Sequence, residues 1–431
     1  MTTRALASMA VIGLLAATAL PTRCLAQQHN NQLPRYSVID LGTLPGGTYS
    51  LAGGLSNAGW VEGFSTLDND TALHAVLWRH DGPIDLGTMG GTSSDSGWRP
   101  NNWGDAGGGS DTATSDPMGE DFCGHGTNLI CLPFLWRHNT GKMTPLPTLG
   151  GNNAWAAGVN DQDEVAGVSE NTIAEPTCPP AQPGQTPQIF QWKPVHWSNG
   201  RIHALPTFRK DPVGEALAIN ASGDIVGWSG DCVNVRHALL WRNGKAIDLG
   251  NLGGKFNNEA LDINSWGQVV GFSDVPQDAT GHAFLWQWGF MIDLGTLPGD
   301  VGSSGDGINN WGQVVGGSYD ADENSRAFLW QDGVMTDLNT LIPADSPLYL
   351  LEATGTINDA GEIAGQAVQL STGEIHAFLL IPRYDKAIGD ATNATLAVGA
   401  PRPHVTIPEN VRQSLRRARI ARFKGLQMGK P

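Results

Sequence analysis

Three short motifs recur along the chain, and the segment 307–338 shows them best: GINNWGQVVG at 307–316, RAFLW at 326–330 and MTDL at 335–338. The preceding segment repeats them as DIN at 262–264, QVVG at 268–271, HAFLW at 282–286 and MIDLGTL at 291–297. The tryptophans that end the central motif are spaced by 44, 45 and 44 residues at Trp197, Trp241, Trp286 and Trp330. A fixed period of this length indicates a repeat architecture.

The glycine that ends the Val-Val-Gly motif identifies seven copies of the unit, at Gly63, Gly108, Gly167, Gly227, Gly271, Gly316 and Gly365. Each copy reads as four short β-strands, and Asn-x-x-Gly is the typical turn between the first two strands. Asn243-Gly244 and Asp332-Gly333 supply the equivalent turn between the last two strands. Four strands in a unit of about 45 residues are typical of a propeller blade.

The two ends of the repeat region complement each other. The last copy has its first three strands, through Ile381, but no fourth, whereas YSVIDLGTL at 36–44 matches a fourth strand with no preceding three. Pairing them would remove the exposed edges that an open array of sheets would present. The sequence therefore predicts an all-β, seven-bladed β-propeller of four-stranded blades over 36–383, with the ring closed by the N-terminal strand joining the last blade.

These motifs resemble those of the HAF-repeat family of extracellular repeat proteins. The name-giving motif appears as His282-Ala283-Phe284 and His376-Ala377-Phe378, and the resemblance covers about residues 36 to 381. It implies an exported protein but supplies no activity.

The segments outside the repeats differ from it in composition. Arg4, an apolar run from 5 to 20 and Cys24-Leu25-Ala26 predict a signal peptide over 1–26, followed by a linker over 27–35. Residues 384–431 carry nine basic against three acidic side chains, which predicts a basic tail that is partly disordered or forms a short helix. We expect a secreted protein, located outside the cell or in the periplasm and cell envelope.

Charge and cysteine content narrow the class of protein. Residues 27–383 carry 39 acidic and 15 basic side chains, and such an acidic surface repels nucleic acid. No segment after the signal peptide is apolar for the ~18 residues that a membrane span needs, so we expect no membrane span. We also expect a monomer. Four cysteines remain after cleavage and allow three pairings; short separation favours Cys123–Cys131, which leaves Cys178–Cys232.

The motif histidine is the first residue to test for chemistry. The seven aligned positions hold His74, Leu132, Lys193, His237, His282, Arg326 and His376. Three of these cannot act like a histidine, so the position reads as structural. We predict no catalytic residue, cofactor site or metal site.

Two other recurring polar positions have local explanations. The motif asparagine, with Ser56 in the first copy, is expected to bond the backbone of its own turn; it recurs as Asn101, Asn160, Asn220, Asn264, Asn309 and Asn358. The strand-four aspartates are expected to keep an edge strand soluble: Asp40, Asp85, Asp248, Asp293 and Asp337. The acidic clusters at 68–70 and 320–324 lack a complete calcium-binding loop and read as solvated loop charge.

Function must then come from an exposed surface. Insertions at 109–131 and 169–192 enlarge the loops between strands two and three, and both contain cysteines. This region of the sequence also contains Trp98, Trp103 and Trp155. We expect these tryptophans to lie in the core; any of them that is exposed would instead stack on sugars or peptides. The predicted function is a non-enzymatic binding or structural module for an extracellular protein or glycan partner, with the cysteine-bearing face as the working face. The alternative is a hydrolase or lyase of an extracellular polymer that uses carboxylates near the channel.

Overall fold

The computed structural model describes residues 33–67, 70–79, 82–181, 186–277 and 280–383. The predicted signal peptide, most of the predicted linker and the basic tail lie outside these residues. Within them, no helix is long and apolar enough to cross a bilayer.

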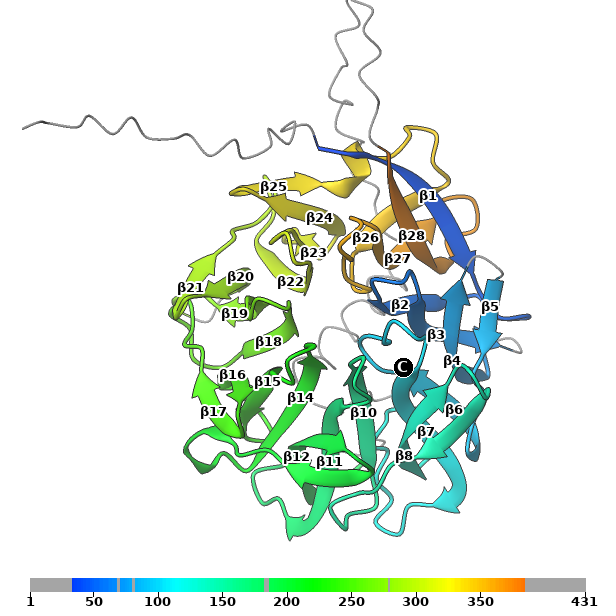
Figure 1. Ribbon diagram of the computed structural model, residues 1–431, viewed down its shortest axis with the longest axis vertical. Helices are drawn as coiled ribbons and strands as arrows, with labels where there is room; N and C mark the ends of the chain where they lie inside the picture. Colours follow the sequence, from blue (N-terminus) through cyan, green and yellow to red (C-terminus); the bar gives the residue numbers. More distant parts are fainter. Residues whose placement is uncertain (1–32, 68–69, 80–81, 182–185, 278–279, 384–431) are drawn as a thin grey trace, which may run out of the picture. The chain divides into compact units, whose positions relative to one another are not determined.

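The seven copies form seven four-stranded antiparallel sheets arranged around a centre (Figure 1). Blades 1 to 3 comprise β2 (Ser50–Leu55), β3 (Val61–Leu67), β4 (Ala72–Arg79) and β5 (Gly82–Asp85); β6 (Gly90–Ser96), β7 (Ala106–Ser115), β8 (Leu129–Arg137) and β9 (Lys142–Pro145); β10 (Ala154–Val159), β11 (Val165–Ala174), β12 (Phe190–Ser198) and β13 (Arg201–Ala204). Blades 4 to 6 comprise β14 (Val213–Ile219), β15 (Ile225–Gly230), β16 (His237–Arg242) and β17 (Lys245–Asp248); β18 (Asn258–Ile263), β19 (Val269–Asp274), β20 (Gly281–Gln287) and β21 (Phe290–Asp293); β22 (Gly302–Ile308), β23 (Val314–Tyr319), β24 (Ser325–Gln331) and β25 (Val334–Asp337). The predicted seven-bladed propeller is confirmed.

Blade 7 combines the two ends of the described chain. It contains β26 (Leu348–Glu352), β27 (Ile363–Gln369), β28 (Ile375–Arg383) and β1 (Arg35–Gly42), in the order β1-β28-β27-β26. β1 runs antiparallel to β28 from the pair Arg35 and Arg383 onward, and the blue and orange strands lie side by side in Figure 1. Tyr36 is buried, and its backbone N–H donates to the carbonyl of Leu341.

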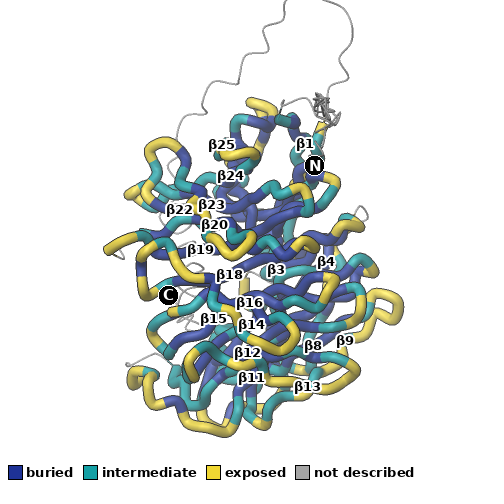
Figure 2. The backbone as a smooth tube through the Cα atoms, turned by 60° about the vertical axis from the view of Figure 1, so that its left-hand side comes forward, coloured by how far each residue is buried: buried dark blue, intermediate teal, exposed yellow. Residues whose placement is uncertain are grey.

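The strand-three tryptophans pack between adjacent blades. Trp78 of blade 1 is 1% exposed and packs in one cluster with Ala364, Ala377 and Leu379 of blade 7. Trp197 and Trp241 are equally well buried. The inner three strands of each blade are buried along most of their length, whereas the outermost strand, the turns and the loops carry most of the exposed residues (Figure 2).

The motif asparagine joins neighbouring blades as well as shaping its own turn. Asn309 accepts hydrogen bonds from the backbone N–H groups of Trp311 and Gln313, and its side-chain amide donates to the carbonyl of Asn358 in the next blade at 3.1 Å. The same donation, at 3.0–3.5 Å, runs from Asn101, Asn160, Asn220, Asn264 and Asn358 to the next blade. We call these residues, with Ser56, the asparagine belt. Ser56 keeps the turn bond, from Trp60 N–H to its hydroxyl, but its short side chain makes no equivalent donation.

Both favoured disulfides are present. Cys123–Cys131 closes a loop within the blade 2 insertion, and Cys178–Cys232 joins the blade 3 insertion to the β15–β16 connection of blade 4. They tie down the two longest loops of the propeller and agree with an oxidising compartment.

One core position departs from the repeat. Glu62 lies on β3 where blades 4, 5 and 6 carry Val226, Val270 and Val315. Its side chain is fully buried, and neither carboxyl oxygen has a hydrogen-bond partner among the described residues. Burial raises the pKa of Glu62 well above its ordinary value of 4.5, because the charged form cannot be solvated there.

Deletion of residues 36–45 is expected to destabilise the whole propeller, because it removes β1 and uncovers β28. Thermal unfolding followed by circular dichroism measures the effect. A synthetic peptide of residues 34–45 should restore part of the lost stability, and unchanged melting of the truncated chain would refute the structural role of this strand.

Glu62→Val is expected to raise the free energy of unfolding at pH 7 by about 1–3 kcal/mol, since it removes an unpaired buried carboxyl. A raised folded-state pKa means that the folded protein holds this proton more tightly than the unfolded chain, so the wild type loses stability as pH rises above about 4.5. The gain from the substitution should therefore grow from pH 4 to pH 8 in urea titrations. Glu62→Gln keeps the shape of the side chain but cannot ionise, so it should raise the free energy of unfolding by less than Glu62→Val does. An increase for Glu62→Val that does not depend on pH would contradict this account.

Candidate functional site

A cavity of about 210 Å³ lies where the inner turns of the blades converge. Its wall contains the asparagine belt except Asn358, together with the polar residues beside the belt: Ser56, Asn57, Asn101, Asn102, Asn160, Asp161, Asn220, Asn264, Asn309, Asn310 and Asp359. All of these belong to the β-hairpins between strands one and two of their blades. We call this end of the propeller the hairpin face.

The hairpin face is not the face predicted to bind a partner. Successive antiparallel strands reverse direction, so both hairpin turns of a blade lie at one end and the inserted strand-two-to-three loops at the other. The described cavity therefore lies opposite the cysteine-bearing loops.

An arginine crosses the channel beneath this cavity. Arg99 of blade 2 donates to Asp262 of blade 5 at 2.7 Å and to Thr356 of blade 7 at 3.3 Å. All three occupy the same repeat position, two residues before the motif asparagine. The other copies carry small residues there, Gly54, Gly158, Ala218 and Gly307, which leaves room for the long side chain.

The Asp262 carboxylate is fully buried and also accepts from the backbone N–H of Ile308. Burial raises the pKa of Asp262, while the nearby Arg99 charge and the backbone donors oppose that rise. The pair joins opposite sides of the ring and forms a charged, hydrogen-bonded floor under the cavity.

A second ring of polar side chains surrounds the asparagine belt. Asp161 accepts from both the backbone and the side-chain amide of Asn102, and Asp359 accepts in the same way from Asn310. The side chain of Asn57 also donates to Asp359. These bonds hold the carboxylates in fixed positions. The opening of the cavity on the hairpin face, which we call the channel mouth, therefore presents ordered polar groups.

Exposed tryptophans stand at the same turn position on three blades. Trp103, Trp266 and Trp311 are 65%, 77% and 73% exposed. The indole N–H of Trp266 donates to the carbonyl of Asn310, and that of Trp311 donates to the carbonyl of Asp359, each on the next blade. The two rings are thus anchored at one edge while most of their surface remains open to solvent. The expected core position is wrong for Trp103, whereas Trp98 and Trp155 are partly buried against the core.

The motif histidines are paired within their own blades. His74, His237, His282 and His376 contact Asp85, Asp248, Asp293 and Asp40 at 2.8, 3.2, 3.0 and 2.9 Å, and Arg326 contacts Asp337 at 3.4 Å. Four of these aspartates also accept from the backbone N–H of the glycine two residues later; Asp337 accepts from that of Asn339. Partial burial alone would raise the pKa of Asp40, but the bonds from His376 and Gly42 lower it. These side-chain pairs lie on separate blades and do not form a shared site.

Nearby side-chain and backbone groups donate hydrogen bonds to an aspartate in each of the two predicted acidic loops. Asp70 accepts from Thr48 and Thr66, while residues 68 and 69 lie outside the described residues. Asp320 accepts from the backbone N–H groups of Asp322 and Asn324. These contacts agree with a turn-forming role for both aspartates.

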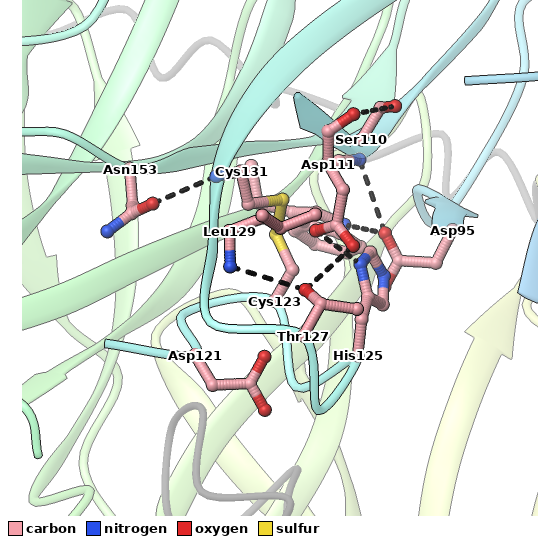
Figure 3. Close-up of a disulfide and its surroundings, with 12 residues drawn as sticks. Asp95, Ser110, Asp111, Asp121, Cys123, His125, Thr127, Leu129, Cys131 and Asn153 are labelled. Carbon is pink, nitrogen blue, oxygen red and sulfur yellow. Dashed lines mark hydrogen bonds and ion pairs between the residues drawn. A yellow bond between two sulfur atoms is a disulfide. The ribbon is translucent and has the colours of Figure 1, made fainter. Parts of the chain in front are cut away.

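The blade 2 insertion buries a charged group beside its disulfide (Figure 3). His125 lies between Asp111, at 2.9 Å from its Nδ1, and Asp95, at 3.8 Å from its Nε2. Burial alone would lower the pKa of His125, but the two carboxylates raise it to about 10. Cys131 lies close enough to share a metal ion with Asp111 and His125, but its sulfur is bonded to Cys123. We therefore interpret the cluster as a structural ion-pair network.

Two glutamates of the insertions form a buried carboxyl pair. Glu120 accepts from the backbone N–H of Ile189, and Glu170 accepts from Gln188 and Asn153. Burial and the neighbouring Glu120 raise the pKa of Glu170 to about 8. Both side chains are fully buried, so the pair lacks the access to substrate that a hydrolase requires.

Comparisons with known proteins found similarity to solved structures alone. No protein-family model matches the chain, and no curated protein sequence matches it. Similar solved structures include the β-propeller domain of the Trilobed protease from Pyrococcus furiosus, with 10% identity, a TM-score of 0.44, and coverage of 70% of this chain and 85% of that one. TolB from Acinetobacter baumannii shows 11% identity, a TM-score of 0.37, and coverage of 75% and 63% respectively.

Proposed function

We propose that this protein is an exported, non-enzymatic glycan-binding propeller whose binding site is the cavity on the hairpin face. The observation that carries the proposal is the pair of anchored, exposed indoles of Trp266 and Trp311 beside a wall of amides and carboxylates. The HAF-type motifs and the disulfides support a location at the cell exterior.

The chemistry of the mouth suits a sugar. A pyranose ring offers an apolar C–H face that packs on an aromatic ring, and hydroxyl groups at its edge that hydrogen-bond to planar amides and carboxylates. Held side chains such as Asn102, Asn310 and Asp359 lose little conformational freedom on binding, which favours affinity.

The charge of the site favours a neutral glycan. Asp161 and Asp359 lie in the cavity wall, and the predicted mature body is strongly acidic. An anionic polysaccharide would be repelled by both. We therefore propose a neutral polymer of pyranose units as the ligand class.

Replacing both Trp266 and Trp311 by alanine is expected to weaken binding of a neutral oligosaccharide at least about tenfold, because two stacking surfaces are lost. A glycan array screened with the full chain identifies the oligosaccharide, and isothermal titration calorimetry measures its affinity. Because both side chains are largely exposed, the melting temperature should change little.

Phe256→Ser serves as the matched control, because this aromatic side chain is 46% exposed in the connection between β17 and β18, away from the hairpin face. Its affinity should equal that of the wild type. The proposal fails if no neutral glycan binds, or if the double variant binds as tightly as the control.

A further inference from the structure

The outer turn of blade 5 carries aromatic residues that the fold does not require. Trp288 and Phe290 are 86% and 72% exposed, the largest exposed fractions among the big apolar side chains apart from those at the channel mouth. They flank Gly289 in the hairpin between β20 and β21. This turn lies at the same end of the blade as the turn that carries Trp266.

Trp288 has an unfavourable backbone conformation for its residue type. Its φ angle is 52°, in the left-handed region, and Gly289 follows at 85°. The equivalent turns of blades 3, 4 and 6 place Asn199, Asn243 and Asp332 there, at 50°, 51° and 52°. Asparagine and aspartate tolerate this region far better than a bulky residue. The tryptophan therefore works against the turn and gains no burial in return.

The position after this glycine also differs between blades. Blades 3 and 4 begin strand four with Arg201 and Lys245, which suit an exposed edge strand, whereas blade 6 has Val334 and blade 5 has the larger Phe290. Compared with blades 3 and 4, two exposed aromatic side chains thus replace polar ones in a single turn. Such a concentration of exposed apolar surface marks an interaction site.

Polar side chains connect this turn to the channel mouth. Gln268 follows the turn of Trp266, and Gln287 directly precedes Trp288; their side-chain amides are hydrogen-bonded to each other at 2.8 Å. On blade 5 this pair of amides therefore joins the turn that carries Trp266 to the turn that carries Trp288.

We propose that Trp288 and Phe290 form an outer subsite for further units of a neutral pyranose chain bound at the mouth. The inference rests on the proposed function and adds that the ligand is a polymer lying along blade 5 instead of a single sugar. A polymer explains why the outer turn tolerates an unfavourable residue: stacking there gains affinity only for a chain long enough to reach it.

The test compares Trp288→Asn with the wild type. The substitution restores the residue found in blades 3 and 4, and a second variant, Trp288→Asn with Phe290→Lys, reproduces the blade 4 turn. The probes are the disaccharides and hexasaccharides of cellulose and of β-1,4-linked N-acetylglucosamine, together with the same lengths of any neutral glycan found on the array. Calorimetry measures affinity, and thermal unfolding measures stability.

In the wild type the hexasaccharide should bind at least about tenfold more tightly than the disaccharide, and Trp288→Asn should remove most of this difference. Disaccharide affinity should stay unchanged, and the melting temperature should stay equal or rise, which a merely structural role of Trp288 would not produce.

The outcomes separate the two proposals. The outer subsite is overturned if the wild type binds both lengths equally, or if Trp288→Asn leaves the hexasaccharide affinity unchanged. In either case, binding that depends on Trp266 and Trp311 would still support the site at the channel mouth. Failure of every neutral glycan to bind the wild type overturns both.

Discussion

The fold depends on an asparagine that serves two blades at once. Its side-chain oxygen accepts from the backbone of its own turn, as Asn309 does from Trp311 and Gln313, while its amide donates to the next turn around the ring. Because the bond to the next blade is buried and the turn bonds are partly buried, replacing the residue would leave several backbone groups without a hydrogen-bond partner. The same bonds set the spacing of the hairpins around the channel, so the belt that holds the ring together also shapes the cavity.

Repetition made the architecture predictable. Each motif specifies a local element, and seven aligned copies with complementary ends allow one simple closed arrangement. The disulfides were predictable because one pair of cysteines lies close in sequence. The pairing of histidine with aspartate was also visible: in the first, fourth and fifth copies the aspartate follows the histidine by 11 residues, and the copies with Leu132 and Lys193 have Pro145 and Ala204 instead.

The site was less predictable, for physical reasons. Arg99 and Asp262 are 163 residues apart and meet only because the ring brings opposite blades together. The tryptophans at the mouth occupy a turn position that holds alanine, glutamine or serine in other copies, so the repeat gives no indication of exposure. The loop insertions predicted a binding site on the opposite face, where the structure has a buried ion-pair network and a buried carboxyl pair.

The closing blade has a mechanical consequence. Arg35 begins β1 and pairs with Arg383 at the end of β28, so the chain enters and leaves the propeller at the same end of one antiparallel ladder. Tension applied through the two ends would act on the hydrogen bonds of this ladder one after another, as in unzipping, and would not load them together in shear. The ring is therefore expected to unfold at a low pulling force applied through its two ends, and to open first at the β1–β28 ladder.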